Sequence, residues 1–316
     1  DLGGPAARLL AVLYLFVLTF GGVLGLRYFQ ESMRVAVMPE MPISILQSGI
    51  LIAALISAYL GLEVTARAGR ILGPIILLAI LIILSASSVG NLEWGRLLPL
   101  LGRGPQSLLL QAPLMMSIVV EIHLLFLLQQ KIVDVKNLMR YTLGILIFTG
   151  FTLTVSQAVI HSILPYPSIS NILFPLLELS RIISIGAFLQ HMEAIFVFSW
   201  FFVQAFTQAI TIYMASYLWQ YIWGIRDLRP LMPAVTLLLF TGATIPEDVL
   251  QLIALERILD KGVIGLSSFV IPLFFVSAAT WWSRRKGGIG GGSPEEVRSA
   301  APHRNSGRWL NRLLGS

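Results

Sequence analysis

The chain has 316 residues, of which 56% are hydrophobic and only 12% are charged, and its mean hydropathy is +0.81. Soluble globular domains have about 45–50% apolar and about 25% charged residues, so the composition excludes an ordinary soluble protein and predicts a polytopic membrane protein. The net charge is +6, and seven of the 22 Lys and Arg residues follow Trp282. We interpret this basic tail as a signal for orientation and expect no nucleic-acid binding.

The chain contains no cysteine, which excludes disulfides, a thiol nucleophile and a Cys-ligated metal site. It has no H-E-x-x-H or G-x-S-x-G motif and no paired intramembrane acids. We therefore predict that the protein is not an enzyme, and that it uses neither a cofactor nor a metal.

Long apolar runs predict membrane helices, because a bilayer core about 30 Å thick needs roughly 20 apolar residues per helical span. The runs do not alternate as the strands of an outer-membrane barrel do, so the predicted fold class is all-α. Eight spans are expected, at about 7–36, 41–61, 70–88, 107–130, 138–164, 190–222, 230–245 and 263–282. They form a transmembrane domain over residues 1–285, followed by a disordered cytoplasmic tail over 286–316 with linker composition.

The first predicted span contains Gly21, Gly22 and Gly25. Small residues on one helix face let a second helix approach closely, and packing is the simpler interpretation of these glycines. The chain opens with Asp1 and enters this span within a few residues, so we expect a processed or incomplete N-terminus.

The fourth predicted span carries an acid, Glu121, within the apolar run APLMMSIVVEIHLLFLL, residues 112–128. The other acids fall nearly all in loops, near span ends or in the tail. An ionised carboxylate at a helix centre costs about 2.5–3.5 kcal/mol, so Glu121 must face a cavity, pair with a base or stay protonated. It is therefore a functional candidate, and the alternative is a neutral acid bonded to a neighbouring helix. Because Pro113 removes a backbone donor and Ser117 precedes the acid, we expect a broken helix whose free backbone groups bind a small substrate.

Between the fifth and sixth spans, residues 167–189 are too polar to cross a membrane and too patterned for a loose loop, so we expect an outer helical hairpin. The sixth span then places four polar residues at i, i+3, i+4 and i+7 on one helix face: Gln204, Thr207, Gln208 and Thr211. Such a stripe binds a polar ligand or lines a water-filled cavity. The alternative is hydrogen bonding between helices, at about 0.6 kcal/mol per contact. In the fifth span we take Thr149, Thr152 and Ser156 as structural, because such hydroxyls bond back to their own helix.

The segment LELSRIISIGAFLQHMEAIFVFSWFF, residues 177–202, resembles the most recognisable part of the spore germination permeases. These are the B-type subunits of nutrient germinant receptors, in the amino acid, polyamine and organocation transporter superfamily. Two further stretches are similar to the same family: LGLEVTARAGRILGPI, residues 60–75, and LLPLLGRGPQSLLLQAP, residues 97–113. The resemblance runs from about residue 7 to 285.

The resemblance implies an inverted-repeat helical bundle of the LeuT type with ten helices, so the eight spans here would be helices three to ten. It also implies that Glu121 matches the acid that closes the break in helix six. Ile118, Val119 and Val120 precede this acid, where the family often has proline and glycine. The implied ligand site comprises the backbone of Ser117 to Val120, the sixth-span stripe and Tyr14, which would approach the same cavity. For Tyr14 the alternative is core packing with a hydrogen bond.

The first functional hypothesis is a membrane-embedded nutrient-sensing subunit of a spore germinant receptor. Its ligand would be an amino-acid-like germinant, and its partners a larger membrane A-type subunit and a lipoprotein C-type subunit. The protein would lie in the spore inner membrane or cell membrane of a spore-forming bacterium, with its C-terminus in the cytoplasm. The alternative is a proton-coupled amino-acid permease in which protonation of Glu121 couples proton and substrate movement. A purely structural scaffold is the third possibility.

Overall fold

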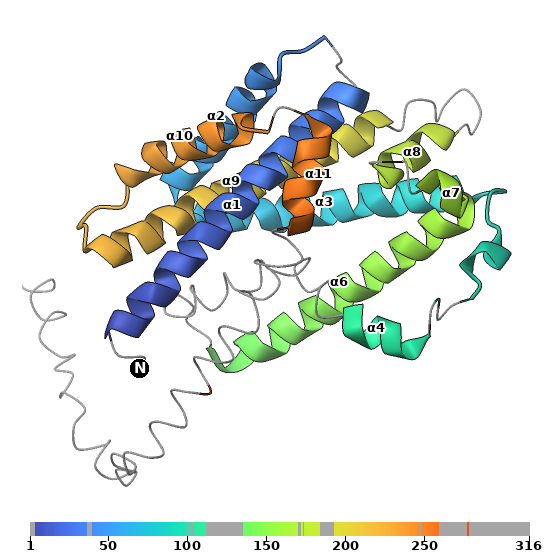
Figure 1. The fold of residues 1–316 in the computed structure, drawn as a ribbon, viewed down its shortest axis with the longest axis horizontal. Helices are drawn as coiled ribbons and strands as arrows, with labels where there is room; N and C mark the ends of the chain where they lie inside the picture. Colours follow the sequence, from blue (N-terminus) through green and yellow to red (C-terminus); the bar gives the residue numbers. More distant parts are fainter. Residues whose placement is uncertain are drawn as a thin grey trace, which may run out of the picture. The chain divides into compact units, whose positions relative to one another are not determined.

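A computed structural model describes residues 4–36, 40–99, 102, 104–111, 135–169, 172, 174–183, 193–246, 248–258 and 277. The regular elements in this part of the chain are all helical, so the predicted fold class is confirmed there (Figure 1). In chain order they are α1 (Gly4–Ala36), α2 (Ile43–Leu60), α3 (Leu62–Ser88), the 3₁₀ helix η1 (Trp94–Leu97), α4 (Pro105–Gln111), α6 (Val135–Ile163), α7 (Tyr166–Ile169), α8 (Pro175–Ile182), α9 (Glu193–Trp223), α10 (Leu231–Thr244) and α11 (Val249–Ile258).

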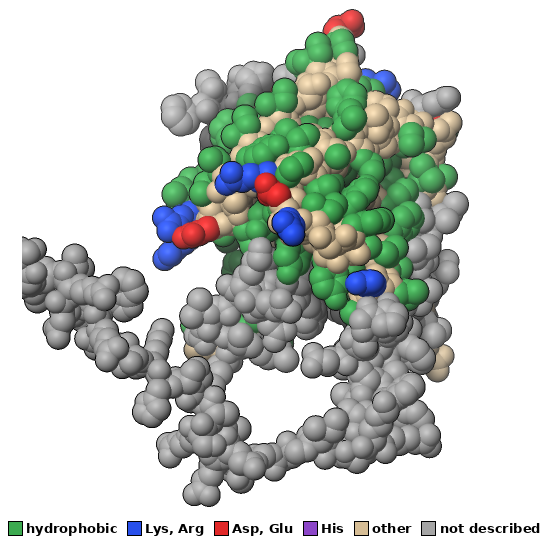
Figure 2. Space-filling model, turned by 90° about the vertical axis from the view of Figure 1, so that its left-hand side faces the viewer, with side chains coloured by type: hydrophobic (Ala, Val, Ile, Leu, Met, Phe, Trp, Pro, Cys, Tyr) green, Lys and Arg blue, Asp and Glu red, His purple; other side chains and the backbone are tan. Residues whose placement is uncertain are grey.

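Five of the described helices are long and apolar enough to cross a membrane, which identifies an integral, multi-pass membrane protein. The candidate spans are Ala7–Arg34, Ile43–Leu60, Leu62–Ser88, Arg140–Ile163 and Glu193–Trp223, and Leu231–Thr244 is a shorter apolar helix. On the side shown in Figure 2, hydrophobic side chains cover much of the described surface. Most of the predicted spans 107–130 and 263–282, part of the hairpin 167–189 and the tail 286–316 lie outside the described residues.

Helix α3 begins at Leu62, earlier than the predicted start at residue 70. Gly61 alone joins it to α2, with φ +97°, a conformation that glycine adopts without a steric penalty. The hydroxyls of Ser57 and Thr65 lie 3.0 Å apart across this turn, and the Thr65 hydroxyl also donates to the Ser57 carbonyl at 3.2 Å. These bonds hold α2 and α3 together as a short-turn helical pair.

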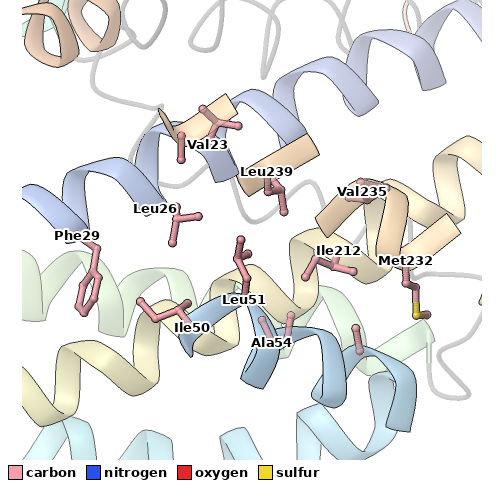
Figure 3. Packing of buried hydrophobic residues seen from close by; sticks show 14 of the residues in the cluster. Val23, Leu26, Phe29, Ile50, Leu51, Ala54, Ile212, Met232, Val235 and Leu239 are labelled. Carbon is pink, nitrogen blue, oxygen red and sulfur yellow. The ribbon is translucent and has the colours of Figure 1, made fainter. Parts of the chain in front are cut away.

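The first of two cores forms where α9 packs against α1, α2 and α10. Figure 3 shows side chains from these helices pointing toward one another, with Leu26 and Phe29 on α1 near Ile50 and Leu51 on α2. Leu26, Ile50 and Ile212 are fully buried. Burying such a side chain contributes about 1.5–3 kcal/mol in water, and inside a bilayer close packing takes over that role.

The second core joins α3, α6, α8 and α9, and it contains much of the segment that carries the family resemblance. Leu177, Leu179, Ile183 and Phe196 from that segment are buried here. The Trp200 ring meets the rings of Phe196 and Phe174 with centroids 5.1 and 5.6 Å apart. Edge-on aromatic pairs of this kind add about 0.5–1.5 kcal/mol beyond their burial.

Three hydroxyl side chains of α6 form hydrogen bonds with the backbone of their own helix. The hydroxyls of Thr152, Thr154 and Ser156 donate to carbonyls one turn earlier, at 2.8–2.9 Å. The structural interpretation of Thr152 and Ser156 is therefore confirmed.

Candidate functional site

Three of the four residues in the predicted polar stripe of α9 are buried against neighbouring helices. Gln204 and Thr211 are each 6% exposed and Gln208 is fully buried. Because the helix repeats every 3.6 residues, these three lie on one face, which α9 turns toward α1. The stripe therefore faces the protein interior over at least this part of its length.

Two glycines of α1 lie opposite this stripe. A Cβ added at Gly22 would lie 2.8 Å from Thr211 Cγ2 and 3.5 Å from Gln208 Oε1, and one added at Gly25 would lie 3.7 Å from Gln204 Nε2. A Cβ at Gly21 would meet no described atom within 4 Å. The packing interpretation is thus confirmed for Gly22 and Gly25, whose missing side chains let the α9 glutamines approach the α1 backbone.

Each of the two buried glutamines has a side-chain atom without a hydrogen-bond partner among the described residues. Gln208 donates from Nε2 to the carbonyl of Gly22 at 2.9 Å. Gln208 Oε1 and Gln204 Nε2 are buried and have no hydrogen-bond partner among the described residues. A buried polar atom without a partner costs about 1–3 kcal/mol. The notch at Gly22 and Gly25 therefore presents one free acceptor and one free donor, a helical turn apart.

Among the described residues, two other predicted site residues, Thr207 and Tyr14, do not lie at this notch. Thr207 is only partly buried, and its hydroxyl donates to the carbonyl of Val203 at 3.0 Å, so it is already satisfied by its own helix. Tyr14 lies on α1 eight residues before Gly22, which is about 12 Å along the helix axis. Ser117, Ile118, Val119, Val120 and Glu121 lie outside the described residues, so their part in a site stays a prediction.

Sequence reasoning missed a second buried polar group, on α1. Glu31 accepts an ion pair from Arg27 at 2.6 Å and from Arg34 at 3.2 Å. Glu31 is 1% and Arg27 4% exposed, and both lie within the candidate span Ala7–Arg34. The expectation that acids other than Glu121 lie in loops or near span ends thus overlooked a buried acid. The signal was the spacing of Arg27, Glu31 and Arg34 at i, i+4 and i+7, which aligns charges on one helix face.

Gln30, beside this ion pair in the sequence, is fully buried as well. Neither its side-chain oxygen nor its nitrogen has a hydrogen-bond partner in the part of the chain that the structure describes. Buried amides are normally hydrogen-bonded. Gln30 is therefore an exception among the described residues of α1.

A sequence profile of a spore germination protein family, the spore permeases, matches residues 2–251. No curated protein and no solved structure matches the chain. The matched region covers well over half of the 316 residues and includes the helices that build both cores. The chain therefore belongs to the spore germination protein family, as its resemblance in residues 177–202 indicates.

Proposed function

We propose that this chain is the nutrient-sensing membrane subunit of a spore germinant receptor. It would bind an amino-acid-like germinant within the membrane and thereby trigger germination. The observation that carries the proposal, beside the family, is a pair of buried glutamines on α9 against the glycine face of α1, each with one side-chain atom that has no partner among the described residues. Buried polar groups that await a partner are what a small polar ligand needs in an apolar surrounding.

The chemistry of the notch suits a small zwitterion. Gln204 Nε2 would donate to a carboxylate, and Gln208 Oε1 would accept from an ammonium group. Gly22 and Gly25 let both amides lie close to the α1 backbone, so a ligand would enter by displacing these packed side chains. In the inverted-repeat fold that the resemblance implies, the backbone of Ser117 to Val120 and Glu121 would complete this site.

Ligand binding would be passed on through α9, which packs against both cores. At the start of α9, Glu193 lies 3.7 Å from Arg181 on α8, and Arg181 also pairs with Glu178 at 3.0 Å. These charges are roughly 40% exposed, so they are accessible to another subunit. We propose that a ligand-dependent shift of α9 changes this charged surface, and that the A-type and C-type subunits bind there and respond to the change.

Substitution of Gln204 tests the site. We expect Gln204→Leu to leave the thermal stability of the ligand-free protein unchanged or higher, because it removes a buried donor that lacks a partner. The same change should abolish stabilisation by ligand, which amounts to about 2.7 kcal/mol at a concentration of 100 times Kd. The measurement is the unfolding temperature in detergent with and without each of a panel of L-amino acids.

Thr207→Ala is the matched control, since the Thr207 hydroxyl is already bonded to Val203. It should keep the ligand-dependent shift. An amino acid that stabilises Gln204→Leu as strongly as the unchanged protein would place the ligand elsewhere.

Uptake by proteoliposomes separates sensing from transport. We expect the protein to bind a radiolabelled amino acid without accumulating it inside the vesicles. Accumulation that is driven by an imposed pH gradient would contradict the sensor and support a proton-coupled permease.

A further inference from the structure

A long apolar groove runs along α1 and lies between this helix, α9, α10 and α11. Its volume is about 480 Å³. Val12, Phe16 and Thr19 contribute to the α1 wall, Trp219 to the α9 wall and Leu255 to the α11 wall. Val12 and Phe16 are 47% and 51% exposed, so the groove is open along this wall.

The walls of the groove are hydrophobic. Among the lining residues, only the Thr19 hydroxyl and the Trp219 indole N–H are polar side-chain groups. A polar nutrient would lose its hydrogen bonds here without replacement, at a cost that such walls do not offset. A hydrocarbon chain has no hydrogen bonds to lose, and it gains close contacts along the whole groove. The chemistry of the walls therefore favours an acyl chain.

A positively charged side chain, Arg8, precedes the groove-lining residues of α1 along this helix. Arg8 is exposed, and it lies at i relative to Val12 at i+4 and Phe16 at i+8, on the same face of α1. It precedes Val12 by one helical turn, about 6 Å along the axis. The candidate span begins at Ala7, so Arg8 lies at the edge of the hydrocarbon layer, where lipid headgroups are found.

On the opposite wall of the groove, aromatic residues of α9 indicate the same depth in the membrane as Arg8. Gly22 of α1 faces Gln208 while Phe29 faces Trp200, so α1 and α9 run antiparallel, and the C-terminal end of α9 lies beside the start of α1. The tilted rings of Trp219 and Trp223 lie there with centroids 5.3 Å apart, and tryptophans are enriched at membrane interfaces. The side of the molecule where the α9–α10 connection lies in Figure 1 shows Lys and Arg side chains, with some Asp and Glu, among hydrophobic ones (Figure 2).

From this arrangement we infer that the groove binds one acyl chain of an anionic phospholipid from the surrounding bilayer. The headgroup phosphate pairs with Arg8, whose planar guanidinium matches phosphate oxygens, and the acyl chain lies against Val12 and Phe16. Charge complementarity selects an anionic lipid over a zwitterionic one. The site is separate from the glutamine notch, so its occupancy and nutrient binding can be measured independently.

Photocrosslinking tests the inference on the full chain. Benzoylphenylalanine replaces Phe16 in protein that is reconstituted into vesicles of equimolar phosphatidylglycerol and phosphatidylcholine with identical acyl chains. Mass spectrometry should show about a fivefold excess of crosslinked phosphatidylglycerol, the preference expected from one arginine near the headgroup. The same probe at Phe151, an exposed α6 residue that does not line the groove, should crosslink the two lipids in the proportion of the vesicle.

Arginine variants assign the preference to one side chain. Arg8→Gln should abolish the excess at the Phe16 probe. Arg70→Gln, which changes an exposed arginine on α3, should keep it. Lipids crosslinked in vesicle proportion, or crosslinks to a second copy or to another segment of the chain, would overturn the inference.

Native mass spectrometry provides a second measurement that needs no probe. Protein released from the same vesicles should retain phosphatidylglycerol in preference to phosphatidylcholine, and Arg8→Gln should lose this preference. Equal retention of the two lipids by the unchanged protein would contradict the site.

Discussion

Glu31→Gln should destabilise the protein by about 3–5 kcal/mol, because it removes the negative charge that buried Arg27 requires. The Arg27 side chain is only 5% exposed, so solvent water cannot replace the lost carboxylate as a partner of its guanidinium. The expected result is a marked fall in the unfolding temperature of the detergent-purified protein. Fluorescence size-exclusion chromatography after heating measures this temperature.

The chain offers a closely matched control. Glu63 and Arg67 on α3 form a pair with the same i, i+4 spacing and the same 2.6 Å separation, but their side chains are 78% and 77% exposed. Glu63→Gln should therefore cost less than about 1 kcal/mol. Replacing both buried charges, in Arg27→Met with Glu31→Leu, should recover most of the loss. If Glu31→Gln and Glu63→Gln are equally mild, Arg27 is not held in a low-dielectric site.

Gly242→Ala should destabilise the contact between α1 and α10 by about 1–3 kcal/mol. A Cβ at Gly242 would lie 2.7 Å from Val23 Cγ2, closer than real side chains approach. Val23 cannot easily turn away, since a β-branched residue in a helix has one strongly preferred rotamer. Thermal unfolding in detergent measures the effect.

Gly21→Ala is the control for the change of residue type. A Cβ there meets no described atom within 4 Å, and alanine is favoured over glycine within a helix by about 0.5–1 kcal/mol. Gly21→Ala should thus raise the unfolding temperature, opposite in sign to Gly242→Ala. Adding Val23→Ala to Gly242→Ala should relieve the clash. Equal stability of the two single variants would show that the helices approach less closely at Gly242.

Much of the architecture could be predicted from apolar runs alone, because membrane helices must satisfy their backbone within each span. The runs predict the all-α fold and the helical regions, but they do not predict a helix boundary that is set by a glycine turn. Gly61 permits α3 to begin directly after α2, whereas composition alone favoured a start near residue 70. Backbone geometry at a single residue made the difference.

The candidate site could be predicted only in part. Periodicity places Gln204, Gln208 and Thr211 on one face, and the structure shows this face against the α1 glycines. Periodicity does not reveal that the Thr207 hydroxyl bonds to its own helix, since that depends on a side-chain rotamer. Likewise Glu31 reads as an acid near the end of a span, and its burial follows from neighbouring helices that no local pattern specifies.

The single-residue turn at Gly61 has a consequence for how the chain connects the two cores. Helix α2 contributes Ile50 and Leu51 to the first core, and α3 contributes Ile83 and Leu84 to the second. Because one residue and the Ser57–Thr65 hydroxyl contact join the two helices, the chain passes from the first core to the second through one short, hydrogen-bonded junction at Gly61.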